Sequence, residues 1–240
     1  MSTTRVEGIF DRLEFPEQLV AHVVDIGDGV SERRIAGYAV ESDLAVQPGF
    51  LATAFLALRG ELPTASELEA FSTALTLLAP TSVTENAGHV AVLARVTAAA
   101  DEVLGAVIAT AVGQATKAEL VDHAGLCAFV DGAAAAPLSC LTTDSAAVDR
   151  YDALTARSQR WFPTPLPSTS TPTSTTGLTR VATAWAVLAK LQFRSPLELH
   201  GLSLLARLPV LFGEARHVVT GSVTRYPTRT PDHHYVEEQR

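Results

Sequence analysis

Two short groups of acidic and histidine residues are the parts of this chain best suited to proton transfer. Asp122 and His123 are adjacent and could form an acid–base pair, because a carboxylate can orient a neighbouring imidazole that acts as the general base. Sequence neighbours point apart on a helix, so a solvated helix end is the simpler interpretation. Glu85, Asn86 and His89 form the second group, where helix capping by Asn86 is the simpler interpretation. Neither group specifies a reaction by itself.

Metal and thiol chemistry receive little support from the sequence. Asp232, His233 and His234 could ligate a metal ion, but adjacent histidines near a chain end are usually only solvated. Cys127 and Cys140 are the only cysteines and lack the spacing of a metal site, so we expect two ordinary thiols. We therefore predict no metal and no other cofactor.

Composition excludes several classes of partner. The 240-residue chain carries a net charge of −8 and has no basic stripe interleaved with aromatic residues, which argues against nucleic-acid binding. Its longest apolar run, residues 51–58, is too short to span a bilayer, and the N-terminus lacks an apolar signal core. With 47% hydrophobic residues it can bury one large core. We expect a soluble, cytoplasmic protein without a membrane partner.

The elements that must position these residues are mostly helical. Thr64 and Glu67 form a capping box, and apolar residues follow at helical spacing as far as Leu78. Residues 88–115 are apolar on all sides, which predicts a helix packed against other helices or a second subunit.

Three other segments complete the outline. Residues 20–38 alternate around a glycine turn and predict a short hairpin, and residues 196–212 predict a helix that Pro209 should kink or end. Residues 162–177 are rich in proline, threonine and serine, which is typical of a flexible loop or, more commonly, a linker.

Several segments resemble citrate synthases and citryl-CoA lyases. Residues 34–45 resemble the family's "R-G-Y-x-I-E-D-L-A" segment, and residues 55–64 its "L-L-x-G-E-L-P-T" segment. Residues 181–182, 204–209 and 215–218 are similar to "N-V-D…A-L-A-R-x-P-G-x-x-A-H-V". The resemblance implies a mainly α fold and a homodimer. It implies a large helical domain at 1–126 and 178–240, beginning with the short β-hairpin, and a reduced, rebuilt small domain at 127–177.

The same resemblance implies that the family's catalytic residues are missing. Leu78 stands where the family's "D-H-G-P-T" has histidine, Thr116 where "G-x-x-H-G-G-A" has histidine, and Ala182 where "N-V-D" has aspartate. None of them transfers protons unaided. Between Cys127 and Thr179 no segment resembles the thioester-binding "G-F-G-H…D-P-R" loop, so coenzyme A binding is not expected. We expect neither citrate synthesis nor citryl-CoA cleavage, and the catalytic residues are unknown.

A binding role is implied for two arginines. Arg207 matches the arginine of "A-R-x-P-G", which contacts a carboxylate in the family, and Arg225 lies near the position of one that reaches in from the neighbouring subunit. Because guanidinium groups pair bidentately with carboxylates, we predict a cleft for a small organic anion that also includes Thr116 and Trp185. The alternatives are an ordinary ion pair for Arg207, and Arg229 in place of Arg225.

Two functions fit these observations. The preferred one is a repurposed enzyme of specialised metabolism, a lyase, cyclase or isomerase, that acts on an anionic small substrate largely by orientation and hydrogen bonding. The alternative is a non-catalytic homologue that serves as a regulatory partner of an active paralogue or as a ligand sensor. A purely structural dimer stays open as well.

Overall fold

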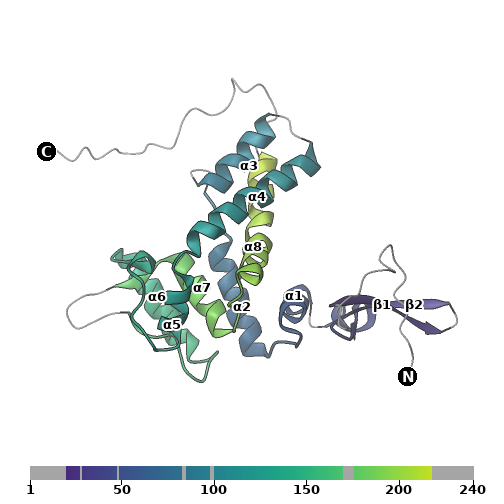
Figure 1. Ribbon diagram of the computed structural model, residues 1–240, viewed down its shortest axis with the longest axis horizontal. Helices are drawn as coiled ribbons and strands as arrows, with labels where there is room; N and C mark the ends of the chain where they lie inside the picture. Colours follow the sequence, from purple (N-terminus) through teal and green to yellow (C-terminus); the bar gives the residue numbers. More distant parts are fainter. Residues whose placement is uncertain are drawn as a thin grey trace.

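A computed structural model describes residues 20–27, 29–47, 49–82, 85–97, 100–169 and 176–217. The chain is mainly helical, as predicted, with a few short strands (Figure 1). In chain order the elements are β1 (Ala21–Gly27), β2 (Val30–Ile35), β3 (Tyr38–Ala39), a π-helical turn η1 (Val40–Leu44), α1 (Phe50–Arg59), α2 (Ala65–Leu78), α3 (Asn86–Val96), α4 (Asp101–Glu119), α5 (His123–Val130), a 3-10 turn η2 (Leu138–Cys140), β4 (Leu141–Thr142), α6 (Ser145–Ser158), β5 (Gly177–Leu178), α7 (Arg180–Lys190) and α8 (Pro196–His217).

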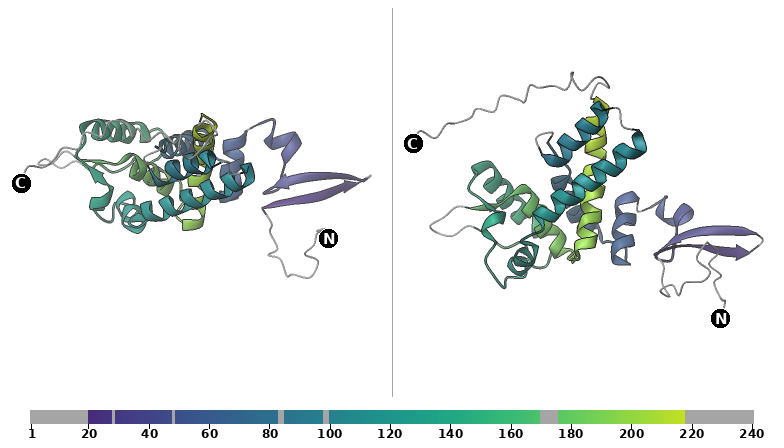
Figure 2. Two further views of the ribbon diagram at one scale, coloured as in Figure 1. Left: turned by 90° about the horizontal axis from the view of Figure 1, so that it is seen from above. Right: turned by 45° about the horizontal axis from the view of Figure 1, so that its top comes forward.

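The predicted N-terminal hairpin is present. Strands β1 and β2 pair antiparallel, with Ala21 opposite Ile35 and Gly27 opposite Val30, and β3 pairs with the end of β2. The hairpin projects from the helical body, next to α1 (Figures 1 and 2).

The main core forms around α2 and α7. The side chain of Thr64 accepts a hydrogen bond from the Glu67 N–H, and the Glu67 carboxylate accepts one from the Thr64 N–H, so the predicted capping box begins α2. This helix buries its apolar face against α7 and α8. Every residue of α7 from 182 to 189 is buried, which makes α7 the central helix of the core.

The apolar stretch 88–115 folds as two helices rather than the single predicted helix. Helix α3 ends at Val96 and α4 begins at Asp101. The two helices pack against each other and against α8, around a second small core that includes Ala91, Ile108 and Leu211. One long helix would leave much of this apolar surface exposed to water. Two shorter helices that fold back on each other bury it.

Helix α8 continues through Pro209 as far as His217, so of the two outcomes predicted for this proline, a kink or the end of the helix, the second does not occur. Apolar residues on both sides of the proline, including Leu202 and Leu211, are fully buried against neighbouring helices. This packing outweighs the backbone hydrogen bond that a proline removes from a helix.

Residues 162–169, the first part of the Pro/Thr/Ser-rich stretch, are held against the helical body. This corrects their interpretation as a linker. Leu166 is buried, and its N–H donates to Ser158 Oγ at 2.9 Å. The Tyr151 hydroxyl donates to Pro167 O at 2.6 Å. These bonds fix the start of the stretch against α6. The predicted division at 127–177 stays a prediction, although Tyr151 and Leu166 share one core with α2 and α7.

The contact between β5 and α6 gives a test of this packing. A Cβ atom on Gly177 would lie 2.8 Å from the Val148 Cα, so Gly177→Ala must displace backbone. We expect it to lower the free energy of unfolding by about 1–3 kcal/mol, measured by urea denaturation with circular dichroism. The control is Gly201→Ala in α8, where nothing lies within 4 Å of the new Cβ; it should be neutral or stabilise by up to ~1 kcal/mol. Equal effects from the two substitutions would contradict this account.

Candidate functional site

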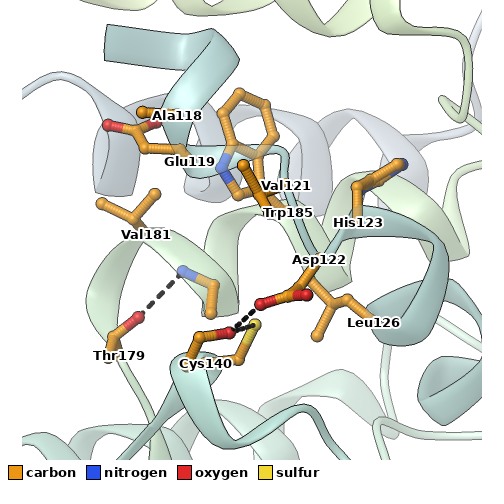
Figure 3. A pocket seen from close by; sticks show the side chains of 12 residues that line it. Ala118, Glu119, Val121, Asp122, His123, Leu126, Cys140, Thr179, Val181 and Trp185 are labelled. Carbon is orange, nitrogen blue, oxygen red and sulfur yellow. Dashed lines mark hydrogen bonds between the residues drawn. The ribbon is translucent and has the colours of Figure 1, made fainter.

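A pocket of about 390 Å³ lies where the end of α4, the start of α5, the η2 turn and the start of α7 meet. Its size suits a small organic molecule. Figure 3 shows the side chains around it, which are Ala118, Glu119, Val121, Asp122, His123, Leu126, Ser139, Cys140, Thr179, Val181, Ala182 and Trp185. We call it the α4–α7 pocket.

Local structure fixes the α7 side of this pocket. Thr179 is the N-cap of α7, and its Oγ1 accepts a hydrogen bond from the Ala182 N–H at 3.2 Å (Figure 3). Ala182 and Trp185 are three residues apart and therefore share a face of the helix. The first turn of α7 contains no acidic residue, so the positive end of the helix dipole at this wall is not neutralised from within the helix.

Glu119, the last residue of α4, joins the pocket to the protein interior. Its Oε1 accepts a hydrogen bond of 2.7 Å from Nη2 of Arg207, whose side chain is only 2% exposed. Its Oε2 is buried and has no hydrogen-bond partner among the described residues. The carboxylate is therefore held through one oxygen while the other remains unused.

Arg207 also supports the end of α2, together with Arg180. The Nε of Arg207 donates to Leu78 O at 3.2 Å. The guanidinium of Arg180 donates to Leu77 O and, at 3.0 Å, to Pro80 O. The last carbonyl groups of a helix have no partner within that helix, so the two arginines cap α2. Burial lowers the pKa of Arg180, and the nearby Glu85 charge opposes this shift.

The opposite side of the pocket carries Asp122 and His123. The Ser139 hydroxyl donates to Asp122 Oδ2 (Figure 3). His123 Nε2 lies 3.4 Å from Cys127 Sγ, and its Nδ1 is buried without a partner in the described part of the chain. Burial, and then the charge of Arg194, lowers the pKa of His123, so the ring is neutral at physiological pH. Asp122 and His123 thus share the pocket but bond to different partners.

The thiols are poor nucleophiles here. Burial raises the pKa of both Cys127 and Cys140, and a thiol rather than a thiolate reacts slowly. The chemistry that this side of the pocket can support is therefore proton transfer by the Asp122 carboxylate or the His123 imidazole.

The structure separates the three positions implied to be catalytic. Ala182 lines the pocket. Thr116 is fully buried and does not line the pocket, and its hydroxyl lies 2.6 Å from Ser203 Oγ and 2.9 Å from Val112 O. The Leu78 side chain is also fully buried, and only its carbonyl contributes, as the acceptor for Arg207.

Of the predicted ligand-binding residues, Trp185 lines the pocket with Ala182, whereas Arg207 is not among the lining residues. Its guanidinium already pairs with Glu119, which matches the ion-pair alternative, and direct ligand contact stays a prediction. Arg225, Arg229 and the 232–234 group lie outside the described residues. Asn86 was expected to be an N-cap, but it is the first residue of α3 and Glu85 occupies the cap position.

Glu119 was missed in the sequence as a functional residue. The available signal was its spacing of three from Thr116 on one helix, which places both on the same face. Ser139 gave no signal, because it reaches the pocket only through folding of the segment between α5 and α6.

The described residues offer neither a metal-binding cluster nor a membrane-spanning helix. They contain no cluster of three or more histidine, cysteine, aspartate or glutamate side chains that could hold a metal. No helix among them has the length and apolar character that crossing a membrane requires.

Comparison with known proteins supports the fold. No family model matches this chain, and no curated protein sequence matches it. Its structure is similar to that of citryl-CoA lyase from Hydrogenobacter thermophilus, with a TM-score of 0.52 and 14% sequence identity over 87% of this chain and 90% of that chain. At this identity the likeness shows a citrate-synthase-like helical fold and does not transfer an activity.

The pairing of Arg207 with Glu119 can be tested by a double-mutant cycle. Arg207→Met leaves a mostly buried carboxylate unpaired, so we expect it to lower the free energy of unfolding by about 3 kcal/mol. Glu119→Gln added to Arg207→Met should recover part of this loss, because no uncompensated charge remains. Urea denaturation of the wild type, both single variants and the double variant measures the coupling. Additive single effects would rule out the pairing as a stabilising contact.

Proposed function

We propose that this chain is a repurposed enzyme of specialised metabolism that converts a small organic anion in the α4–α7 pocket, by a route other than citrate synthase chemistry. The observation that carries the proposal is the pocket itself. It opens beside Ala182, a position that the family resemblance assigns to catalysis, and polar groups from several elements line it.

The start of α7 supports an anionic ligand. Thr179, Val181 and Ala182 line the pocket, and the first N–H groups of a helix attract anions because they lack partners within the helix. We assign the ligand's anionic group to this end of the pocket rather than to Arg207, whose guanidinium is already paired with Glu119.

Glu119 supports a catalytic role for the pocket. A carboxylate with one oxygen fixed and the other free can accept or return a proton without leaving its position. Lyase, cyclase and isomerase reactions are suited to a site that offers one such group and otherwise orients its substrate. A ligand sensor would use the same pocket without turnover, and the buried, inert Leu78 and Thr116 positions favour it as the second candidate.

Substitution at Val181 tests whether the pocket receives an anion. Val181 lies in the first turn of α7, is only partly buried and packs against the edge of the main core. Aspartate there is compatible with the helix dipole, and circular dichroism checks that each variant at this position is folded. We expect Val181→Asp to weaken binding of two- to six-carbon carboxylates at least tenfold through charge repulsion, while the neutral Val181→Asn binds nearly as the wild type does.

Binding is followed by NMR through the indole ¹⁵N–H resonance of Trp185, which also detects weak ligands, and methyl esters of the same acids serve as uncharged controls. The assignment of an anionic ligand would be contradicted if the esters bound as well as the acids. It would also be contradicted if Val181→Asp and Val181→Asn bound the acids with equal affinity. Binding without chemical change of any pocket-sized acid would favour the sensor.

We also propose that two copies of the chain pair through the outer face of α3 and α4. An apolar groove of about 610 Å³ lies there, and Val103 within it is 51% exposed. Exposed apolar surface of this kind is typical of an interface. The residues around the groove are Val90, Glu102, Val103, Ala106, Val107, Thr110 and Ala111.

Light scattering at micromolar concentration should therefore give the mass of a dimer. Val103→Arg places a charge in the proposed interface, so we expect it to yield monomers. Leu197→Arg at the start of α8 is the control, because Leu197 is 83% exposed at a site away from the groove, and it should leave the dimer intact. A wild-type monomer would exclude this pairing.

A further inference from the structure

We infer that the α4–α7 pocket recognises a hydroxyl group on its anionic ligand, held between Glu119 Oε2 and Trp185 Nε1, with Arg207 as the positioning residue. The inference rests on the proposed function, because it names the substrate class of the same pocket. The ligand it specifies is a small hydroxy acid.

The inference is based on two polar atoms at this pocket that lack a hydrogen-bond partner among the described residues. Glu119 Oε2 and Trp185 Nε1 are both buried, and neither has a hydrogen-bond partner in the described ranges. Trp185 itself is only 1% exposed. Both residues line the pocket, and in the view of Figure 3 the indole nitrogen lies on the ring edge nearer Glu119. A buried polar group without a partner has lost its hydration without compensation, so a ligand that satisfies both atoms binds more tightly than one that satisfies neither.

The chemistry of the two atoms selects the ligand group. A carboxylate oxygen only accepts hydrogen bonds, and an indole N–H only donates one. A hydroxyl oxygen does both from one atom, since it can donate to Glu119 while it accepts from Trp185. A second carboxylate would face Glu119 with a like charge, and an ammonium group could not accept from the indole. A carbon–hydrogen group at this place would leave both protein atoms unsatisfied.

Arg207 makes this arrangement specific. Because its Nη2 holds Oε1 of Glu119 and its Nε is bonded to Leu78 O, the carboxylate can turn only Oε2 toward the pocket. The side chain of Glu119 is 23% exposed and lines the pocket, although Oε2 itself is buried. Hydrogen bonds made in a site shielded from water are stronger than those in solution. The hydroxyl preference should therefore be large.

The experiment compares acids that differ by one hydroxyl group. The probes are lactate with propionate, 3-hydroxybutyrate with butyrate, and malate with succinate, titrated into the full-length protein. Trp161 and Trp185 are the only tryptophans, so the spectrum holds two indole ¹⁵N–H resonances, and Trp161→Phe assigns them. We expect at least one hydroxy acid to bind tenfold or more tightly than its partner, since a hydrogen bond to a charged group contributes about 1.5–3 kcal/mol. The Trp185 resonance should shift and the Trp161 resonance should not.

Glu119→Gln tests the acceptor. Arg207 will keep the amide oxygen of the glutamine, so the NH₂ group faces the pocket and the ligand's hydroxyl loses its acceptor. The ratio of the two affinities should then fall clearly below the wild-type ratio, because the hydroxyl keeps its donor in Trp185 Nε1 but loses its charged acceptor. Asp122→Asn is the matched control, since it removes one negative charge from the same pocket at a carboxylate already bonded to Ser139. It should keep the ratio, and circular dichroism confirms folding of each variant.

The outcomes separate the two proposals. Equal affinities within every pair in the wild type, a Trp185 resonance that does not move on binding, or equal loss of preference in Asp122→Asn would each overturn the hydroxyl inference while leaving anion binding in place. If none of the acids binds, or if Val181→Asp binds them all as the wild type does, the proposed function fails and the inference fails with it.

Discussion

The buried guanidinium of Arg207 is the constraint on which the site depends. It lies on α8 and bonds to the end of α2 through Leu78 O and to the end of α4 through Glu119. A charged group in an apolar interior is tolerated only when its donors are satisfied. The ends of α2 and α4 are therefore held together, and the free oxygen of Glu119 is presented to the pocket as a consequence.

This interaction explains why a leucine is acceptable at position 78. Arg207 uses the backbone carbonyl of that residue rather than its side chain, so the side chain can change without disturbing the ion pair. The Leu78 side chain instead fills the core beside Phe71 and Leu75 on α2. The side chain at position 78 is thus a packing side chain, and the ion pair of Arg207 does not depend on it.

The parts of the fold that follow from local rules could be predicted from the sequence. The capping box at Thr64 and the hairpin at residues 20–38 depend on short-range hydrogen bonds and turns, and both are present. The break between α3 and α4 could not be predicted, because residues 97–100 read Thr-Ala-Ala-Ala with neither glycine nor proline. It follows instead from packing of both helices on α8. The site was only partly predictable for the same reason, since Glu119, Ser139 and Trp185 meet through tertiary contacts.

Two polar residues near the end of α4 lie in different surroundings. Thr116 is sealed in the core by its bond to Ser203, whereas Glu119 lies three residues further along α4 and reaches the pocket. Residues three apart on a helix share a face, so the end of α4, rather than a different face of the helix, contributes the carboxylate to the pocket. Helix α7 provides another wall of the pocket through Ala182 and Trp185. The chemical character of this pocket therefore depends on a few side chains at the end of α4 and the start of α7, and the packing of the helices fixes only their positions.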